Sequence, residues 1–178
     1  MERMVALLRA VNVGGRKLPM AELRDLCGKL GWRDVATYIQ SGNVVFTAAG
    51  RSEAIETALE QAIAKGFGLD VPVVVRTAAQ WADYPSRNPF AKAARDEPNR
   101  LMLLLSKSPP ATGAEDVIQA RATAGEIVKR AGDALWIHFP KGAGTSKLTP
   151  SLIDRAIGSP ATSRNHNSVI KLKEMLDA

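Results

Sequence analysis

The order of apolar segments in the first half of the chain restricts the fold more than any other feature. Branched apolar residues predict a strand over residues 4–11, and a helical period of apolar residues follows it. Two more strands surround the turn pair Ser41-Gly42. A second helix is predicted over residues 51–66 and a fourth strand over 69–76. Strand, helix, strand, strand, helix, strand is the order of the ferredoxin-like fold.

The second half of the chain repeats most of this order. A strand over 100–106, a helix, two strands around 131–133 and a helix to about Ile157 precede a last helix over 163–176. Residues 84–99 hold three prolines and no period, so they predict a connection. We therefore expect an α+β protein of two closely packed ferredoxin-like halves, βαββαβ followed by a βαββα-type half and a C-terminal helix. The predicted boundaries are 1–84 for the N-terminal half, 85–99 for the connection and 100–178 for the C-terminal half.

Composition narrows the class of protein. Apolar residues make up 46% of the chain and charged residues 24%, which supports a folded core and argues against disorder. Cys27 is the single cysteine, which excludes an intrachain disulfide and favours a reducing compartment. No apolar run has the length of a signal-peptide core or of a membrane span. These features predict a soluble cytoplasmic protein without a membrane partner.

The segment LLRAVNVGGRKLPMAEL over residues 7–23 runs from a strand into a helix. It matches neither the dinucleotide fingerprint nor the P-loop. Backbone amides at Gly14-Gly15, the cations Arg16 and Lys17 and a helix N-terminus would all favour an anion. For the segment alone, the plain explanation that the two glycines only turn the chain is the simpler one.

Three further segments carry polar side chains at turns. In YIQSGNVVF, Gln40, Ser41 and Asn43 could bond a ligand, although a tight hairpin explains them equally. In KGAGTSKLT, Lys147 could meet a phosphate or be an ordinary solvated lysine. In TSRNHNS, Arg164 follows residues that also suit a plain helix cap.

Charge is distributed unevenly between these segments and the rest of the chain. Residues 9–17, 38–43, 141–149 and 162–168 contain six of the 24 cationic residues and none of the 18 acidic residues. The remaining 18 cations equal the 18 acids, so the net charge of +6 lies wholly in the four segments. If the segments meet in space, they would form an anion site. The six cations are Arg9, Arg16, Lys17, Lys141, Lys147 and Arg164.

The same segments offer little for catalysis. They contain no pair of carboxylates for acid and base, and His166 is their only general-base candidate. His138 lies in the apolar stretch LWIHFP, which indicates a structural role. Cys27 falls on the apolar face of its helix, which favours the core over a nucleophile. One cysteine and two distant histidines predict no metal site, and no cofactor motif is present.

Taken together, LLRAVNVGGRKLPMAEL, TYIQSGNVVF, RNPF, GAGTSKLT and TSRNHNSVIKL resemble the bacterial family called domain of unknown function 1697. The resemblance covers nearly the whole chain and implies a small α+β protein with ferredoxin-like elements, without an established activity. The family pattern has Gly where Ala10 stands and Trp where His166 stands. The family's signature positions, whose roles are unassigned, are Arg9, Asn12, Gly14, Gly15, Ser41, Gly42, Asn43, Ser146, Lys147, Arg164 and Asn165.

Three functions remain open on the sequence. The first is binding of a phosphorylated or anionic ligand in a basic Gly/Asn/Ser-rich site between the halves, formed by the signature residues. The second is an enzyme of phosphoryl or acyl transfer that stabilises a developing anion. The third is a nucleic-acid-associated or oligomeric structural protein, although the RNA-recognition signature is absent and aromatic residues are only 5% of the chain. Neither the occurrence of turnover nor an oligomeric state follows from the residues.

Overall fold

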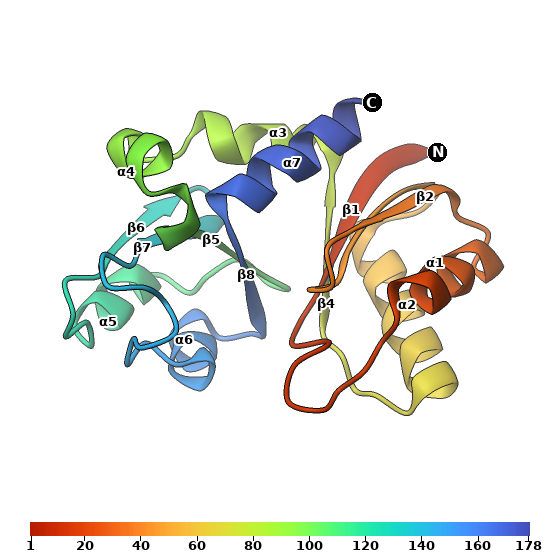
Figure 1. Cartoon of the computed structure of the whole chain (residues 1–178), viewed down its shortest axis with the longest axis horizontal. Helices are drawn as coiled ribbons and strands as arrows, with labels where there is room; N and C mark the ends of the chain where they lie inside the picture. The colour runs from red at the N-terminus through yellow and green to blue at the C-terminus, as the bar shows by residue number, and fades with distance from the viewer. The chain divides into compact units, whose positions relative to one another are not determined.

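The computed structural model describes residues 1–178, which form two compact units (Figure 1). The first contains Met1–Trp81 and Leu172–Ala178, and the second contains Ala82–Lys171. Each unit has one four-stranded antiparallel sheet with helices. None of the helices combines the length and the apolar composition that crossing a bilayer would require.

The first unit has the predicted ferredoxin-like order. Its strands lie in the order β2-β3-β1-β4, with every neighbouring pair antiparallel, as the split βαβ topology requires. The predicted hairpin around Ser41-Gly42 is confirmed, since β2 and β3 pair on either side of it. The elements are β1 (Glu2–Leu8), α1 (Met20–Lys29), β2 (Arg33–Tyr38), β3 (Asn43–Ala48), α2 (Ser52–Phe67) and β4 (Val73–Thr77).

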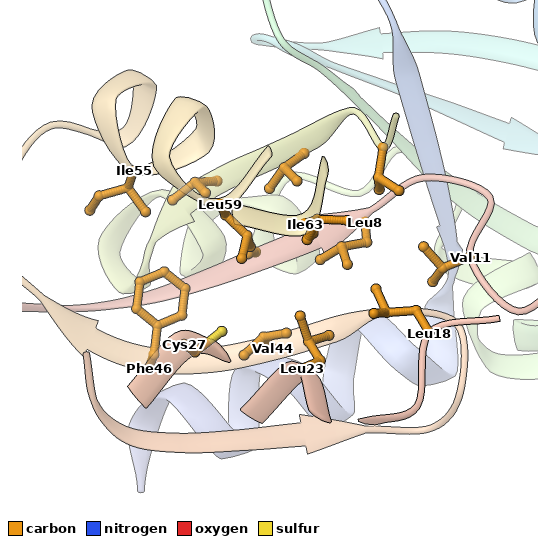
Figure 2. Close-up of a cluster of buried hydrophobic side chains, with 14 of the residues drawn as sticks. Leu8, Val11, Leu18, Leu23, Cys27, Val44, Phe46, Ile55, Leu59 and Ile63 are labelled. Atoms are coloured by element: carbon orange, nitrogen blue, oxygen red, sulfur yellow. The ribbon is translucent and has the colours of Figure 1, made fainter. Parts of the chain in front are cut away.

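The core of the first unit lies between its sheet and its two long helices (Figure 2). Leu23 of α1 and Leu59 of α2 are fully buried against Phe46 of β3. Burial of one such side chain stabilises the fold by about 1.5–3 kcal/mol. Cys27 lies in the same cluster, and burial raises the pKa of its thiol to about 12, so the cysteine is a core residue as predicted.

The second unit repeats this architecture in full. Its strands lie in the order β6-β7-β5-β8, again with every neighbouring pair antiparallel. The α+β class with two ferredoxin-like halves and a C-terminal helix is therefore confirmed, and the second half contains one strand more than expected. Its elements are β5 (Leu101–Ser106), α5 (Ala114–Gln119), β6 (Ile127–Ala131), β7 (Ala134–His138), α6 (Pro150–Ile157) and β8 (Ala161–Asn165). The C-terminal helix α7 (His166–Asp177) follows β8, and its residues from Leu172 onward belong to the first unit.

The additional strand corrects the prediction that the terminal helix begins at Ser163. Residues Ala161–Asn165 form β8, which pairs with β5, and α7 begins only at His166. Ala161 is the only apolar side chain in this strand, so the alternating pattern of a strand is absent from the sequence. Thr162, Ser163 and Asn165 are all residue types that favour the N-cap, so the sequence does not define the start of the helix. In the structure Asn165 caps the helix, because its side-chain oxygen accepts a hydrogen bond of 2.9 Å from the Ser168 N–H.

Short helices occupy the proline-containing stretch for which the sequence analysis expected no regular element. They are α3 (Ala78–Ser86), α4 (Ala91–Asp96) and a 3-10 turn over Pro98–Arg100. Helices of one or two turns show too few residues to establish a period, and Pro85 lies inside α3. The sequence signal of these helices is therefore weak.

The second core lies between the sheet and the helices α5 and α6. Leu135 and Ile137 of β7 point to this side, against Ile118 of α5 and Ile157 of α6. Alternation then directs Trp136 and His138 to the opposite face of the sheet. Trp136 is fully buried there, and His138 is partly exposed.

Candidate functional site

Three loops of the first unit lie at one end of its sheet, which we call the loop end. They are residues 9–19 between β1 and α1, 39–42 between β2 and β3, and 68–72 between α2 and β4. In this topology β1 and β2 finish where β3 and β4 start, so the three loops share one end. In Figure 1 the first of them is the red loop that leads from β1 to α1.

Hydrogen bonds between these loops hold the loop end together. The Leu8 N–H donates to the Gly42 carbonyl at 2.8 Å, and the Arg9 N–H donates to the Pro72 carbonyl at 3.0 Å. The Arg16 guanidinium donates to the Asp70 carbonyl. The structure therefore brings together the predicted site residues of the first unit, which are Arg9, Asn12, Gly14, Gly15, Ser41, Gly42 and Asn43.

The Asn12 side chain links two of the loops. Its amide donates to the Leu18 carbonyl at 3.0 Å and to the Gln40 carbonyl at 2.6 Å, and its oxygen accepts from the Leu18 N–H at 2.9 Å. Both amide hydrogens are therefore used within the protein. Asn12 sets the shape of the first loop and its place beside the hairpin.

The Asn43 side chain holds the turn of the hairpin in place. It is fully buried, and its amide donates to the Tyr38 carbonyl at 2.9 Å and to the Ser41 hydroxyl at 3.0 Å. These contacts close the turn between β2 and β3. Asn43 therefore has a structural role in this structure, as the plain explanation of the hairpin predicts.

The backbone of the loop end is strained at three residues other than glycine. Ala10, Asn12 and Ile39 have φ angles of 53°, 56° and 50°, in the left-handed region. A branched residue such as Ile39 rarely adopts this conformation, which persists only where the surroundings impose it. Strain of this kind accumulates at functional sites, so the loop end is the candidate site of the first unit.

We expect Ala10→Gly to raise the free energy of unfolding by up to about 1 kcal/mol, because a left-handed residue with a Cβ carries a cost that glycine avoids. Ala10 is exposed at a φ of 53°, so the family's glycine at this position is explained by backbone conformation. Denaturant titration of both proteins measures the change. The control is Ala49→Gly, also exposed and outside regular structure, at a residue without a positive φ. A loss of stability in Ala10→Gly would contradict the explanation.

The first loop of the loop end carries three cationic residues. Lys17 is exposed, Arg9 and Arg16 are half-buried, and the Arg16 Nε is buried without a hydrogen-bond partner. Gly14 and Gly15 have left-handed φ angles of 57° and 81°, and a Cβ on either would meet no atom within 4 Å. The backbone of this turn is therefore open to an approaching ligand.

The N-terminus of α1 follows Arg16 and Lys17 closely in the chain. Its N-cap is Pro19, which provides no side-chain acceptor, so the N–H groups of the first turn have no side-chain cap. The positive end of the helix dipole adds to the charge of Lys17 beside it. Asp70 is the only acidic residue in the three loops. The charged side chains of the three loops are therefore predominantly cationic.

Ser146 in the second unit contacts a buried carboxylate. Its hydroxyl donates to Glu126 at 2.6 Å and accepts from the Leu148 N–H at 3.1 Å. The second Glu126 oxygen accepts from the Ala124 N–H at 2.7 Å. The Ser146 hydroxyl lowers the pKa of Glu126 most, the backbone donors lower it further, and burial opposes them. Lys147 beside it is exposed.

Arg164 and Asn165 lie on β8. Arg164 is only 7% exposed, and its guanidinium donates to the Thr162 hydroxyl at 2.8 Å and to the Ser163 carbonyl at 2.7 Å. Burial lowers its pKa to about 10, so it remains charged at neutral pH. Asn165 caps α7 as described above.

His166 begins α7, at the position where the family pattern has Trp. Its ring centroid lies 6.2 Å from that of Trp136, with the rings tilted by 46°. Burial lowers its pKa below 6.5, so the imidazole is neutral at pH 7. The histidine therefore packs against an aromatic neighbour.

Sequence reasoning missed the partners that define these arrangements. Nothing in the sequence connects Glu126 with Ser146, or Asp70 with Arg16, because the contacts form through tertiary structure. The only signal is the absence of acids from the basic segments, which identified the cations but not their acceptors. No group of three His, Cys, Asp or Glu side chains lies close enough to hold a metal ion.

Comparison with known proteins agrees with this fold. A solved structure of the conserved bacterial protein SP0830 from Streptococcus pneumoniae is 22% identical and superposes with a TM-score of 0.75, over 98% of each chain. At this identity the likeness shows the fold alone. No curated protein matches the chain. The model of the family described as protein of unknown function (DUF1697) matches residues 1–136, which is most of the chain, so this protein belongs to that family.

Proposed function

We propose that the first unit binds a phosphorylated or otherwise anionic small molecule at its loop end. The observation that carries the proposal is the position of Arg16 and Lys17 directly before the uncapped N-terminus of α1, with Arg9 in the same loop and Asp70 as the only acid in the three loops. Helix N-termini with adjacent cations favour phosphate and carboxylate groups.

The roles of the loop-end residues divide into two kinds. Lys17 and the open backbone at Gly14 and Gly15 would meet the ligand, since they are exposed, and the half-buried Arg9 would add positive charge in the same loop. Asn12 and Asn43 hold the loops in place, because their amide hydrogens already have partners inside the protein. Ser146, Lys147, Arg164 and Asn165 belong to the second unit, and this proposal does not depend on them.

The experiment is a titration with pyrophosphate at low ionic strength, followed by the backbone amide resonances of the loop end. We expect saturable shifts at Gly14, Gly15 and Met20, and about tenfold weaker binding in Lys17→Ala. A hydrogen bond to a charged group is worth about 1.5 kcal/mol or more, which corresponds to about tenfold.

The matched control is Lys29→Ala at the other end of the same helix. Lys29 is also exposed, so this variant removes the same charge without changing the loop end. Equal weakening in both variants would show only general attraction to a basic protein and would contradict the proposal. A short single-stranded oligonucleotide that binds with a steep salt dependence but shifts no loop-end amide would also contradict the proposal. It would favour binding of the phosphate backbone of a nucleic acid instead.

A cytoplasmic location is part of this proposal. The thiol of Cys27 is free and buried, which is compatible with a reducing compartment.

A further inference from the structure

An open cavity of about 510 Å³ is lined by residues of the second unit only, and none of them belongs to the proposed anion site. Its apolar lining includes Pro89, Phe90 and Ala93, and its ionisable lining includes Lys92, Glu97 and His138. A volume in this range holds a small organic molecule. Pro89 and Phe90 belong to the RNPF motif, to which neither the fold nor the anion proposal gave a role.

His138 and Glu97 form a hydrogen-bonded pair in the wall of this cavity. The His138 Nε2 lies 2.9 Å from the Glu97 Oε2, and the other Glu97 oxygen accepts from Arg100 at 3.1 Å. Arg100 also donates to the Pro140 carbonyl at 2.7 Å. Glu97 is therefore held from two sides and fixes the orientation of the imidazole.

This pair determines which nitrogen of His138 faces a ligand as an acceptor. An ionised carboxylate only accepts hydrogen bonds, so Nε2 carries the hydrogen. Nδ1 of the neutral ring then carries a lone pair. It has no hydrogen-bond partner in the protein and is not completely buried.

The remaining charges of the lining favour a neutral ligand. Glu97 is paired with Arg100 and His138, and Asp96 lies 3.1 Å from the Arg95 Nε. Glu97 therefore already has partners, and Asp96 is exposed to water, where an ion pair with an ammonium group would contribute little. Lys92 is exposed to water, where a single ion pair contributes little.

Phe90 provides a flat apolar wall. Lys129 Nζ lies 5.0 Å from the centroid of its ring, a cation–π contact that orients the ring. The His138 ring lies 6.2 Å from it at an angle of 46°. A second aromatic ring would find an apolar face and a hydrogen-bond acceptor within the same cavity.

We propose that this cavity binds a small, neutral ring compound with a hydroxyl group, of the phenol class, which donates its hydrogen bond to Nδ1 of His138 while Glu97 positions the imidazole. The inference is independent of the anion site in the first unit. Its ligand is uncharged and its residues all belong to the second unit.

The test compares phenol with anisole, which has the same ring but no hydroxyl donor, in mildly alkaline buffer. The chain has two histidines, so His166 serves as an internal reference for the imidazole resonances of His138. We expect phenol to shift the His138 resonances saturably and those of His166 hardly at all. Phenol should bind about 2- to 10-fold more tightly than anisole, the value of one neutral hydrogen bond.

Two variants separate the hydrogen bond from general packing. In His138→Phe the preference for phenol over anisole should disappear, whereas in His166→Phe it should persist. In Glu97→Gln the side-chain amide can donate to Nε2, which moves the ring hydrogen to Nδ1 and removes the acceptor. The imidazole nitrogen shifts of that variant report the tautomer directly, so the test remains decisive if His138→Phe does not fold.

The proposal would be overturned by equal binding of phenol and anisole, by matching shifts at both histidines, or by no binding of phenol. Tighter binding of benzylamine or benzoate than of phenol would also overturn it, because the lining would then select a charge.

Discussion

Gly42→Ala is expected to lower the free energy of unfolding of the first unit by about 3 kcal/mol or more. A Cβ at this position would lie 2.7 Å from the Leu8 Cβ and 2.7 Å from the Val11 Cγ2. Leu8 and Val11 are both buried, and the Leu8 N–H donates to the Gly42 carbonyl. Moving Leu8 away from the new Cβ would therefore break the hydrogen bond between β1 and the turn. Overpacking of this kind costs about 1–3 kcal/mol.

The backbone adds a second cost at the same position. Gly42 has a φ of 84°, in the left-handed region, which costs a residue with a Cβ about 1–2 kcal/mol. The matched control is Gly15→Ala, since Gly15 has a φ of 81° and a Cβ there meets nothing within 4 Å. Denaturant titration of the two variants separates the cost of close packing from the cost of the left-handed backbone. Equal losses would show that the packing against Leu8 and Val11 contributes nothing.

Glu126→Ala is expected to lower the free energy of unfolding of the second unit by about 3 kcal/mol, since it removes two hydrogen bonds to a buried charged group. Glu126 is 3% exposed and accepts from the Ser146 hydroxyl at 2.6 Å and from the Ala124 N–H at 2.7 Å. Ser146→Ala should cost less, because the Ala124 bond remains. The double variant should lose less than the sum of the two single losses, because both remove the same contact.

The pH dependence of stability checks the same contact. The folded pKa of Glu126 lies below the ordinary value of 4.5, chiefly because the Ser146 hydroxyl donates to the ionised form. The contribution of ionised Glu126 to the free energy of unfolding is therefore complete above about pH 4.5. It is lost as the pH falls through the folded pKa. Ser146→Ala should flatten the loss of stability in this acidic window.

His166 affects a different range of pH. Its folded pKa is lowered from 6.5 by burial, so protonation favours the unfolded chain and stability falls as the pH drops below about 6.5. The effect of His166 protonation on stability is the same in the parent protein and in Ser146→Ala. It therefore cancels when the free energies of unfolding of the two proteins are subtracted. A difference that does not change with pH below 4.5 would show that Ser146 does not bond the ionised carboxylate.

These expectations give physical roles to two of the family's signature positions. Gly42 is a glycine because of a close approach and a left-handed backbone, and Ser146 satisfies a buried carboxylate. Part of the signature thus maintains the fold. Under the proposed function, Lys17 and the open backbone at Gly14 and Gly15 would instead meet the ligand.

The sequence by itself determined the fold class and the first unit. Hydrophobic periodicity is a local property, so strands β1 to β4 and helices α1 and α2 could be predicted, together with the hairpin at Ser41-Gly42 and the burial of Cys27. The concentration of positive charge in a few glycine-rich segments was also visible, because charge is counted without a structure.

Only the tertiary structure decided the rest. Strand β8 exists because its backbone pairs with β5, and its one apolar side chain gave no alternating pattern. The Glu126–Ser146 contact and the Glu97–His138 pair join residues 20 and 41 positions apart. Which side chains contact one another in this way depends on how whole helices and strands pack. Local sequence propensity carries no information about that packing. The cavity beside His138 arises for the same reason, since its walls come from separate segments that meet only in the folded unit.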